Sequence, residues 1–330
     1  MLNPAPTSRN RPGASATRDG QPAPLRPLST DIHQHLWPEE LLAALSRRAE
    51  APRLVRTGRA WELRARGESA CVVDPIDHDP VRRGQRAFDD GIERVIIAPS
   101  CPIGIEALPA AAAAPLLDAY HTGVARLGAP FGAWAAAGLA DPDPVTLADH
   151  LSSGFVGLCA PAGAFSAPAE IGRVAPLLEV LDARSAPLLI HPGPAPWDPA
   201  PDVPSSAPGW WAALTTYVAQ MQRAWFVVNQ FLRRDFPSLR ICFTVLAGLA
   251  PLQADRLRSR GGGFGNDRTT FLETSSYGPE ITLAVSAVVG DGAIVFGTDR
   301  PVVNTVPAPV WGGEIARGNA ARLLVGEVEK

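Results

Sequence analysis

Four side chains in the sequence have the types and settings of metal ligands. His33 and His35 are two residues apart at the end of an apolar run, so both imidazoles would point to one face of a strand. His191 closes another apolar run and leads into a Pro-Gly-Pro turn. Asp299 closes a third, where a carboxylate is costly unless it is paired or binds a cation. Three neutral imidazoles and one carboxylate suit Zn²⁺, with Fe²⁺ and Mn²⁺ as alternatives, and such a cation makes bound water acidic enough to attack near neutral pH.

Each ligand also has a structural interpretation that the residues alone leave open. His191 could be a capped core histidine, and Asp299 could form an ion pair with Arg300. Cys159 lies near the end of a further apolar run, where it could be a small buried hydrophobic residue or one more metal ligand. The other three histidines, in expected helices or loops, are weaker candidates for chemistry: His78, His121 and His150.

Eight short apolar runs alternate with segments of helical spacing, which predicts an α/β protein with a (β/α)₈ TIM barrel. In such a barrel the carboxyl ends of the strands meet at one rim, where active sites form. The alternative is a doubly wound open sheet, but the nearest glycine-rich motif, at 261–266, does not follow a strand. The runs are Ser29–Leu36, Glu93–Pro99, Phe131–Ala137, Phe155–Ala160, Pro187–His191, Leu239–Leu246, Thr269–Ser275 and Ala293–Asp299.

The chain divides into a leader and one domain. Residues 1–27 are rich in Pro, Ala, Arg and Ser without hydrophobic periodicity, which predicts a disordered leader, followed by a single barrel over 28–330. Residues 53–74 break the strand–helix alternation and predict a small antiparallel β-hairpin inserted after the first strand, with turns near 57–58 and 66–67. The proline-rich loop over 192–209 is expected at the rim.

The composition excludes several classes of function. The net charge is −3, so nothing favours nucleic acid or an anionic membrane as a partner. Lys330 is the only lysine, which disfavours Schiff-base enzymes, phosphate-loop NTPases and lysine-bridged two-metal sites. The four cysteines are far apart, as expected for free thiols in a reducing compartment. No run suits a membrane span or a signal peptide, so a cytoplasmic protein is expected.

Five motifs, in this order along the chain, resemble the amidohydrolase superfamily, in the amidohydrolase-related branch that includes aminocarboxymuconate-semialdehyde decarboxylase. They are D-I-H-Q-H (31–35), L-I-H-P-G (189–193), A-G-L-A-P (247–251), G-T-D-R-P (297–301) and G-N-A-A-R-L-L (318–324). The resemblance spans most of residues 29–325. It implies a distorted barrel with one metal, usually zinc, held by His33, His35, His191 and Asp299, and a small insertion after the first strand. The branch often forms dimers, so a homodimer is the candidate assembly.

One position departs from this resemblance. The family has a histidine just before the turn after strand six, where it exchanges protons, but Val245 stands at that place here. Asp299 then becomes the candidate catalytic proton acceptor. Arg300, Trp197 and Tyr277 are candidates for binding a small-molecule substrate, with ion pairing or packing as their structural alternatives.

Three functions are consistent with these residues. The main hypothesis is a metal-dependent hydrolase of a small carbonyl compound. The second is a non-oxidative, metal-dependent decarboxylase of an aromatic or muconate-type acid. The third, suggested by Val245, is a degenerate barrel that binds a ligand but turns it over poorly.

Overall fold

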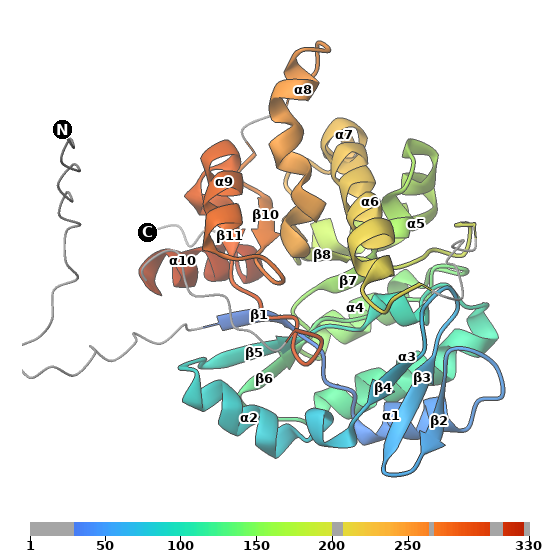
Figure 1. Ribbon diagram of the computed structural model, residues 1–330. Helices are drawn as coiled ribbons and strands as arrows, with labels where there is room; N and C mark the ends of the chain where they lie inside the picture. The colour runs from blue at the N-terminus through green and yellow to red at the C-terminus, as the bar shows by residue number, and fades with distance from the viewer. Residues whose placement is uncertain (1–29, 200–206, 264–266, 304–312, 327–330) are drawn as a thin grey trace, which may run out of the picture.

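The computed structural model describes residues 30–199, 207–263, 267–303 and 313–326, with side chains described from residue 317 onward in the last range. The leader expected over 1–27 lies outside these residues. Figure 1 shows the parallel strands in the middle of the molecule with helices around them. Each of the eight expected apolar runs contributes one strand to this centre.

The eight strands form two parallel sheets. The first sheet has the order β1, β5, β6, and the second has the order β11, β10, β9, β8, β7. The strands are β1 (Thr30–Gln34), β5 (Arg94–Ile97), β6 (Phe131–Ala133), β7 (Leu158–Pro161), β8 (Leu188–His191), β9 (Ile241–Phe243), β10 (Thr270–Glu273) and β11 (Ile294–Val295).

The two sheets meet at both of their edges. An isolated parallel bridge joins Gln34, at the end of β1, to Arg300, beyond β11. A second bridge joins Ala135, beyond β6, to Leu158 in β7. The short regular strands stop before these seams, which is why two sheets are present where an uninterrupted ring was expected.

The space inside the strands is filled by one apolar cluster. Every one of the eight strand segments places a buried side chain in it: Ile32, Ile96, Trp134, Cys159, Leu189, Cys242, Phe271 and Val295. Ala320 and Leu323 of α10 belong to the same cluster. The alternate strand residues, such as Ile190 and Leu272, belong to a second and larger cluster. This two-sided burial explains why the strands read as continuous apolar runs.

Helices α1 to α9 lie between successive strands, and α10 follows the last strand. They are α1 (Glu39–Ser46), α2 (Pro80–Asp89), α3 (Ala110–Ala125), α4 (Pro144–Ser152), α5 (Pro168–Ala183), α6 (Trp211–Val227), α7 (Arg233–Asp235), α8 (Ala254–Arg258), α9 (Pro279–Val289) and α10 (Gly313–Leu324). A π-helical stretch, η4 (Val228–Leu232), links α6 to α7. Short 3₁₀ segments are η1 (Pro75–His78), η2 (Cys101–Ile103), η3 (Ala162–Phe165), η5 (Val245–Gln253) and η6 (Asp291–Ala293).

The segment expected as a hairpin is a three-stranded antiparallel sheet. Its strands are β2 (Arg53–Thr57), β3 (Ala60–Arg64) and β4 (Cys71–Val73), paired in the order β2, β3, β4. The two expected turns contain Gly58 and Gly67, both with positive φ. The third strand is short, with two of its three residues exposed, so the sequence carries little apolar pattern for it.

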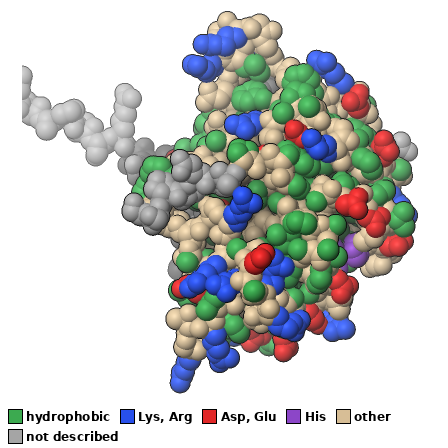
Figure 2. Space-filling model, turned by 90° about the vertical axis from the view of Figure 1, so that its right-hand side faces the viewer, with side chains coloured by type: hydrophobic (Ala, Val, Ile, Leu, Met, Phe, Trp, Pro, Cys, Tyr) green, Lys and Arg blue, Asp and Glu red, His purple; other side chains and the backbone are tan. Residues whose placement is uncertain are grey.

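Charged side chains are mixed on the surface. On the face seen in Figure 2, arginine and acidic side chains alternate with apolar ones. Within the described ranges, no helix has both the length and the apolar character needed to cross a membrane. The four cysteines carry free thiols, of which Cys71 alone is exposed.

Candidate metal centre

The four ligands expected from the sequence converge at one point. The Nε2 atoms of His33 and His35 lie 3.3 Å apart. Asp299 Oδ1 is 3.0 Å from His35 Nε2 and 3.7 Å from His33 Nε2. The His191 ring centroid is 4.9 Å from that of His33 and 5.1 Å from that of His35. One ligand atom from each of the four residues falls within 4.8 Å of all the others.

The fold brings these residues together because each one ends a strand. His33 lies in β1, His191 is the last residue of β8, and Asp299 follows β11. Parallel strands end at the same rim, so distant sequence positions become neighbours. All four residues are at most 9% exposed, so the ligand atoms face a largely dry site.

Hydrogen bonds fix the orientation of each imidazole. The Nδ1 atom of His35 is 2.9 Å from the carbonyl oxygen of Ala98, and that of His191 is 2.8 Å from the carbonyl oxygen of Pro192. The Nδ1 atom of His33 is 3.2 Å from Glu273 Oε2. Because a carbonyl or carboxylate can only accept, each Nδ1 carries the proton and donates. In the neutral form of each imidazole, Nε2 then carries the lone pair and can bind a cation at the common point.

Asp299 is held toward the histidines and not toward Arg300. Its backbone has a φ of +55°, a left-handed conformation that Asp tolerates better than most residues. Its backbone N–H donates to the His33 carbonyl oxygen at 2.9 Å. Arg300 instead pairs through Nη1 with Asp90 at 2.5 Å. The ion pair between Asp299 and Arg300 that the sequence left open is therefore absent.

The site favours an ionised carboxylate at Asp299 and a neutral imidazole at His191. Burial raises the pKa of Asp299, but the neighbouring His35 and the charges of His33 and His191 outweigh burial and lower it below the usual range. Burial, assisted by His33 and His35, lowers the pKa of His191 well below its usual value. For His33, burial lowers the pKa, but Glu273 and the other nearby carboxylates raise it more. A carboxylate among imidazoles with free lone pairs is the state that binds a cation.

The donor set fits one divalent cation. Ligands about 2.1 Å from a tetrahedral Zn²⁺ lie about 3.4 Å from one another, which is close to the 3.3 Å between the two Nε2 atoms. Asp299 Oδ1 is buried and has no hydrogen-bond partner of acceptable geometry. A buried carboxylate oxygen without a partner is costly, and a cation at this point would compensate it.

Glu273 is a site residue that the sequence analysis missed. It ends β10, is fully buried, and accepts hydrogen bonds from Ser275 N at 2.5 Å and Val245 N at 3.2 Å in addition to facing His33. A carboxylate behind a ligating histidine fixes its tautomer and increases its basicity. The signal was a glutamate closing the apolar run T-T-F-L-E, the same signal that identified Asp299.

The turn after β9 has an unusual backbone. Val245, Leu246, Ala247, Gly248 and Leu249 all have φ between +46° and +65°. Four of these five are not glycine, and non-glycine residues rarely enter the left-handed region in succession. Strain of this kind is typical of segments that the surrounding structure holds for function. In this turn the Val245 N–H donates a hydrogen bond to Glu273, so the backbone of Val245, and not its side chain, contacts the residues around the centre.

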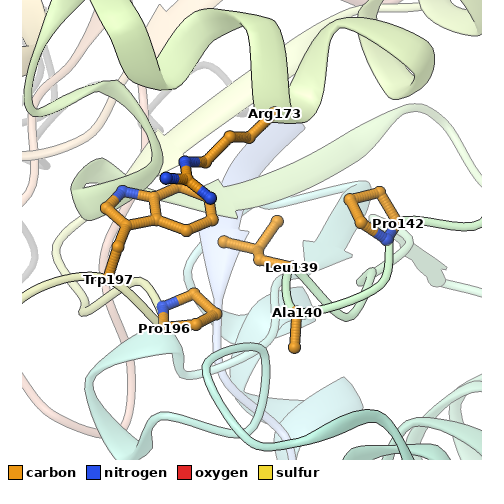
Figure 3. Close-up of a pocket in the computed structure, with 6 residues that line it drawn as sticks. All are labelled: Leu139, Ala140, Pro142, Arg173, Pro196 and Trp197. Carbon is orange, nitrogen blue, oxygen red and sulfur yellow. The ribbon is translucent and has the colours of Figure 1, made fainter.

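The candidate substrate-binding residues lie in different surroundings. Arg300 is 3% exposed and committed to Asp90, so its guanidinium is not free for a substrate carboxylate. Tyr277 is half-buried beyond the end of β10. Trp197 lines a cavity of about 420 Å³. There its ring stacks on the Arg173 guanidinium at 5.0 Å, above Leu139 (Figure 3).

The other candidates are explained by packing. His78 accepts a hydrogen bond from Trp37 N at 3.0 Å and stacks on the Trp37 ring. His121 accepts one from Ala136 N at 3.0 Å and stacks on His150. Cys159 is fully buried inside the strands, 3.8 Å from the sulfur of Cys101. Among the described residues these groups are outside the ligand cluster.

Comparison with known proteins gives structural neighbours only. No family model and no curated protein matches the chain. A structure named amidohydrolase II is 16% identical, with 90% of this chain and 99% of that chain covered at a TM-score of 0.66. A mutant 5-carboxyvanillate decarboxylase from Novosphingobium aromaticivorans, with bound manganese and a nitrobenzoic acid, is 14% identical. The match covers 91% of this chain and 99% of that chain, at a TM-score of 0.66. A 2,6-dihydroxybenzoate decarboxylase from Rhizobium is 16% identical, and the match covers 91% of this chain and 99% of that chain at a TM-score of 0.61. The expected amidohydrolase resemblance is thus confirmed at the level of fold: the chain has the fold that these amidohydrolase and decarboxylase structures share.

Proposed function

We propose that the chain is a metal-dependent enzyme of the amidohydrolase superfamily whose site is the His33, His35, His191 and Asp299 cluster. The observation that carries the proposal is the convergence of three Nε2 atoms and one carboxylate oxygen, each imidazole held by a separate acceptor at Nδ1. We further propose that the two sheets act as one distorted (β/α)₈ barrel, since bridges join them at both edges.

The reaction that the site supports best is non-oxidative decarboxylation of a small aromatic acid. Several structural neighbours are named as decarboxylases of such acids. This was the second of the functions expected from the sequence. Zn²⁺ suits the donor set, and Mn²⁺, which is bound in several of the neighbouring structures, is the alternative.

Some residues of the site would hold the metal and fix its ligands, and Asp299 could also transfer a proton. A divalent cation at this point would attract electron density from a substrate carbonyl or carboxylate and hold it in place. Glu273 keeps the His33 ring in its tautomer and orientation. Asp299, ionised and short of a hydrogen-bond partner, can also accept a proton. Val245 brings no side-chain proton to the site.

Hydrolysis of a small carbonyl compound is the second candidate. Asp299 is placed to take the proton of a water molecule, and one neighbour is named amidohydrolase II. Release of carbon dioxide from an aromatic acid, without uptake of water, separates the two reactions.

The test is the metal content of the purified protein. We expect a stoichiometric divalent metal in the wild type by elemental analysis, lost in His33→Ala and in His191→Ala because each removes one of four ligands. His150→Ala is the control, since His150 stacks on His121 outside the cluster. Metal-loaded wild type is then assayed for carbon dioxide release on a panel of hydroxybenzoic acids. Wild-type protein without stoichiometric metal at neutral pH contradicts the proposal.

A further inference from the structure

A charged side chain is buried next to the end of β1. Arg83, in α2, is 6% exposed, whereas its neighbour Arg82 lies on the surface. Burial lowers the pKa of Arg83 to about 10, so the guanidinium keeps its charge at neutral pH. The four hydrogen bonds described for it all go to uncharged oxygens, three of them backbone carbonyls. A buried charge is costly, so a guanidinium spent on backbone carbonyls needs an explanation.

The Arg83 guanidinium connects the two chain segments that carry His35 and Asp299. Its Nη1 donates to the His35 carbonyl oxygen at 2.9 Å. Its Nη2 donates at 3.3 Å to the carbonyl oxygen of Arg300, the residue directly after Asp299. Because Nη1 and Nη2 belong to one planar and rigid group, the two carbonyls are held at a fixed separation.

The same two segments also contact each other directly. The His35 N–H donates to the Arg300 carbonyl oxygen at 2.6 Å, so this oxygen accepts from His35 and from Arg83 together. The Asp299 Oδ1 and His35 Nε2 atoms lie 3.0 Å apart on the side of the centre. A shift of the Arg300 backbone would therefore change the distance between two ligand atoms.

The remaining hydrogen bonds fix the orientation of Arg83 itself. Nη1 also donates to the Asp77 carbonyl oxygen at 3.0 Å, and Nη2 donates to Gln34 Oε1. Gln34 Nε2 donates to Asp31 Oδ2 at 2.7 Å, and Asp31 Oδ1 accepts from the His33 N–H at 3.1 Å. The network around Arg83 thus reaches the backbone of a third ligand.

We propose that Arg83 is a positioning residue of the metal centre, which holds His35 and Asp299 at the spacing of a single cation. The inference rests on the proposed metal-dependent function and assigns Arg83 no contact with metal or substrate. Ligands that are already at the spacing of a metal site lose less conformational freedom when they bind a cation. Lysine would keep the charge, but its donors sit on one nitrogen and cannot hold two carbonyls at the spacing of the fork.

The experiment compares metal binding by Arg83→Lys and Arg83→Met with that of wild type. Competition with a chelator of known affinity gives the dissociation constants for Zn²⁺ and Mn²⁺. We expect both constants to rise about 10- to 100-fold in each variant. The visible absorption spectrum of Co²⁺-loaded protein, which depends on ligand geometry, should change as well. Arg82→Lys, at the exposed neighbouring position on α2, is the matched control and should bind as wild type.

A second control separates positioning from general stability. In Gly157→Ala the new methyl group would collide with the Pro187 carbonyl oxygen, at the seam on the other side of the sheets. This variant should lose stability, measured by urea unfolding of metal-free protein, and keep the dissociation constants of wild type. If neither Arg83 variant folds, Gln34→Met, which removes one acceptor of Nη2, is measured in the same way.

Two outcomes overturn the inference. One is a pair of dissociation constants in Arg83→Lys, or in Gln34→Met where that variant replaces it, equal to those of wild type. The other is a change in metal binding no larger than that of Gly157→Ala, which would make Arg83 a structural residue only. Wild-type protein that binds no metal instead contradicts the proposed function, so the two failures are distinguishable.

Discussion

At the scale of single residues, the acceptors behind the imidazoles decide whether the cluster can bind a cation. His33, His35 and His191 each donate from Nδ1, two of them to backbone carbonyls and one to Glu273. A free imidazole would divide its time between two tautomers and many orientations, so these hydrogen bonds remove an entropic cost of binding. The only one of the three acceptors that a substitution can remove is the side chain of Glu273.

Replacement of Glu273 by glutamine should weaken metal binding about 10- to 100-fold. The charge behind His33 is lost while the size of the side chain is kept, so the imidazole becomes a poorer donor. Competition with a chelator of known affinity measures the dissociation constant. Glu280→Gln, an exposed position at the start of α9, is the matched control. A dissociation constant equal to that of wild type would show that Glu273 does not support the centre.

At the scale of elements, histidines that look catalytic in the sequence hold elements in place. His121, in α3, accepts the Ala136 N–H and stacks on His150 of α4. The hydrogen bond requires a neutral Nε2, and burial together with His150 lowers the pKa of His121 to about 3. Such a histidine contributes to the pH dependence of stability and not to catalysis.

The acid sensitivity of the protein should therefore depend on His121. The unfolded chain binds a proton at His121 near pH 6.5 and the folded chain only near pH 3, so stability falls as the pH drops between these values. Between pH 7 and pH 5 this group alone should cost on the order of 2 kcal/mol. Urea unfolding of metal-free protein at both pH values measures the loss. His121→Gln, which keeps an acceptor that does not titrate, should reduce it, and an identical loss in this variant would refute the assignment.

At the scale of the whole molecule, the seam between the two parallel sheets places the candidate ligands next to one another. β1 and the segment after β11 are far apart in sequence, yet Ile32 N donates to the Phe296 carbonyl oxygen at 3.1 Å. Asp31 reinforces this seam by accepting hydrogen bonds from Thr298 Oγ1 at 2.7 Å and Gln34 Nε2 at 2.7 Å. Without this seam Asp299 would not face His33 and His35.

The opposite seam offers a test of how tightly the two sheets pack against each other. Gly157 precedes β7, and a methyl group there would collide with the Pro187 carbonyl oxygen and the Trp134 ring. We expect Gly157→Ala to destabilise the protein by about 1–3 kcal/mol, because backbone on one side cannot yield. Gly172→Ala in α5 has open space around it and should be neutral or slightly stabilising. Urea unfolding compares the two, and equal stability of both variants would show that the seam is loosely packed.

The sequence by itself determined the strand-forming runs and the four candidate ligands. Buried parallel strands need continuous apolar runs, and a polar residue that closes such a run must lie at an end of the strand. His33, His35, His191 and Asp299 could therefore be chosen without knowledge of any contact. The same reasoning, applied to the run that ends at Glu273, would have found that residue as well.

Only the tertiary structure decided which partner each polar group takes. Arg300 pairs with Asp90 and not with Asp299, although Asp299 is its neighbour in the chain. Local periodicity reports which face of an element is buried, but the choice among distant partners depends on the path of the folded chain through the two sheets. That path is set by packing over the whole molecule, so no stretch of sequence contains it.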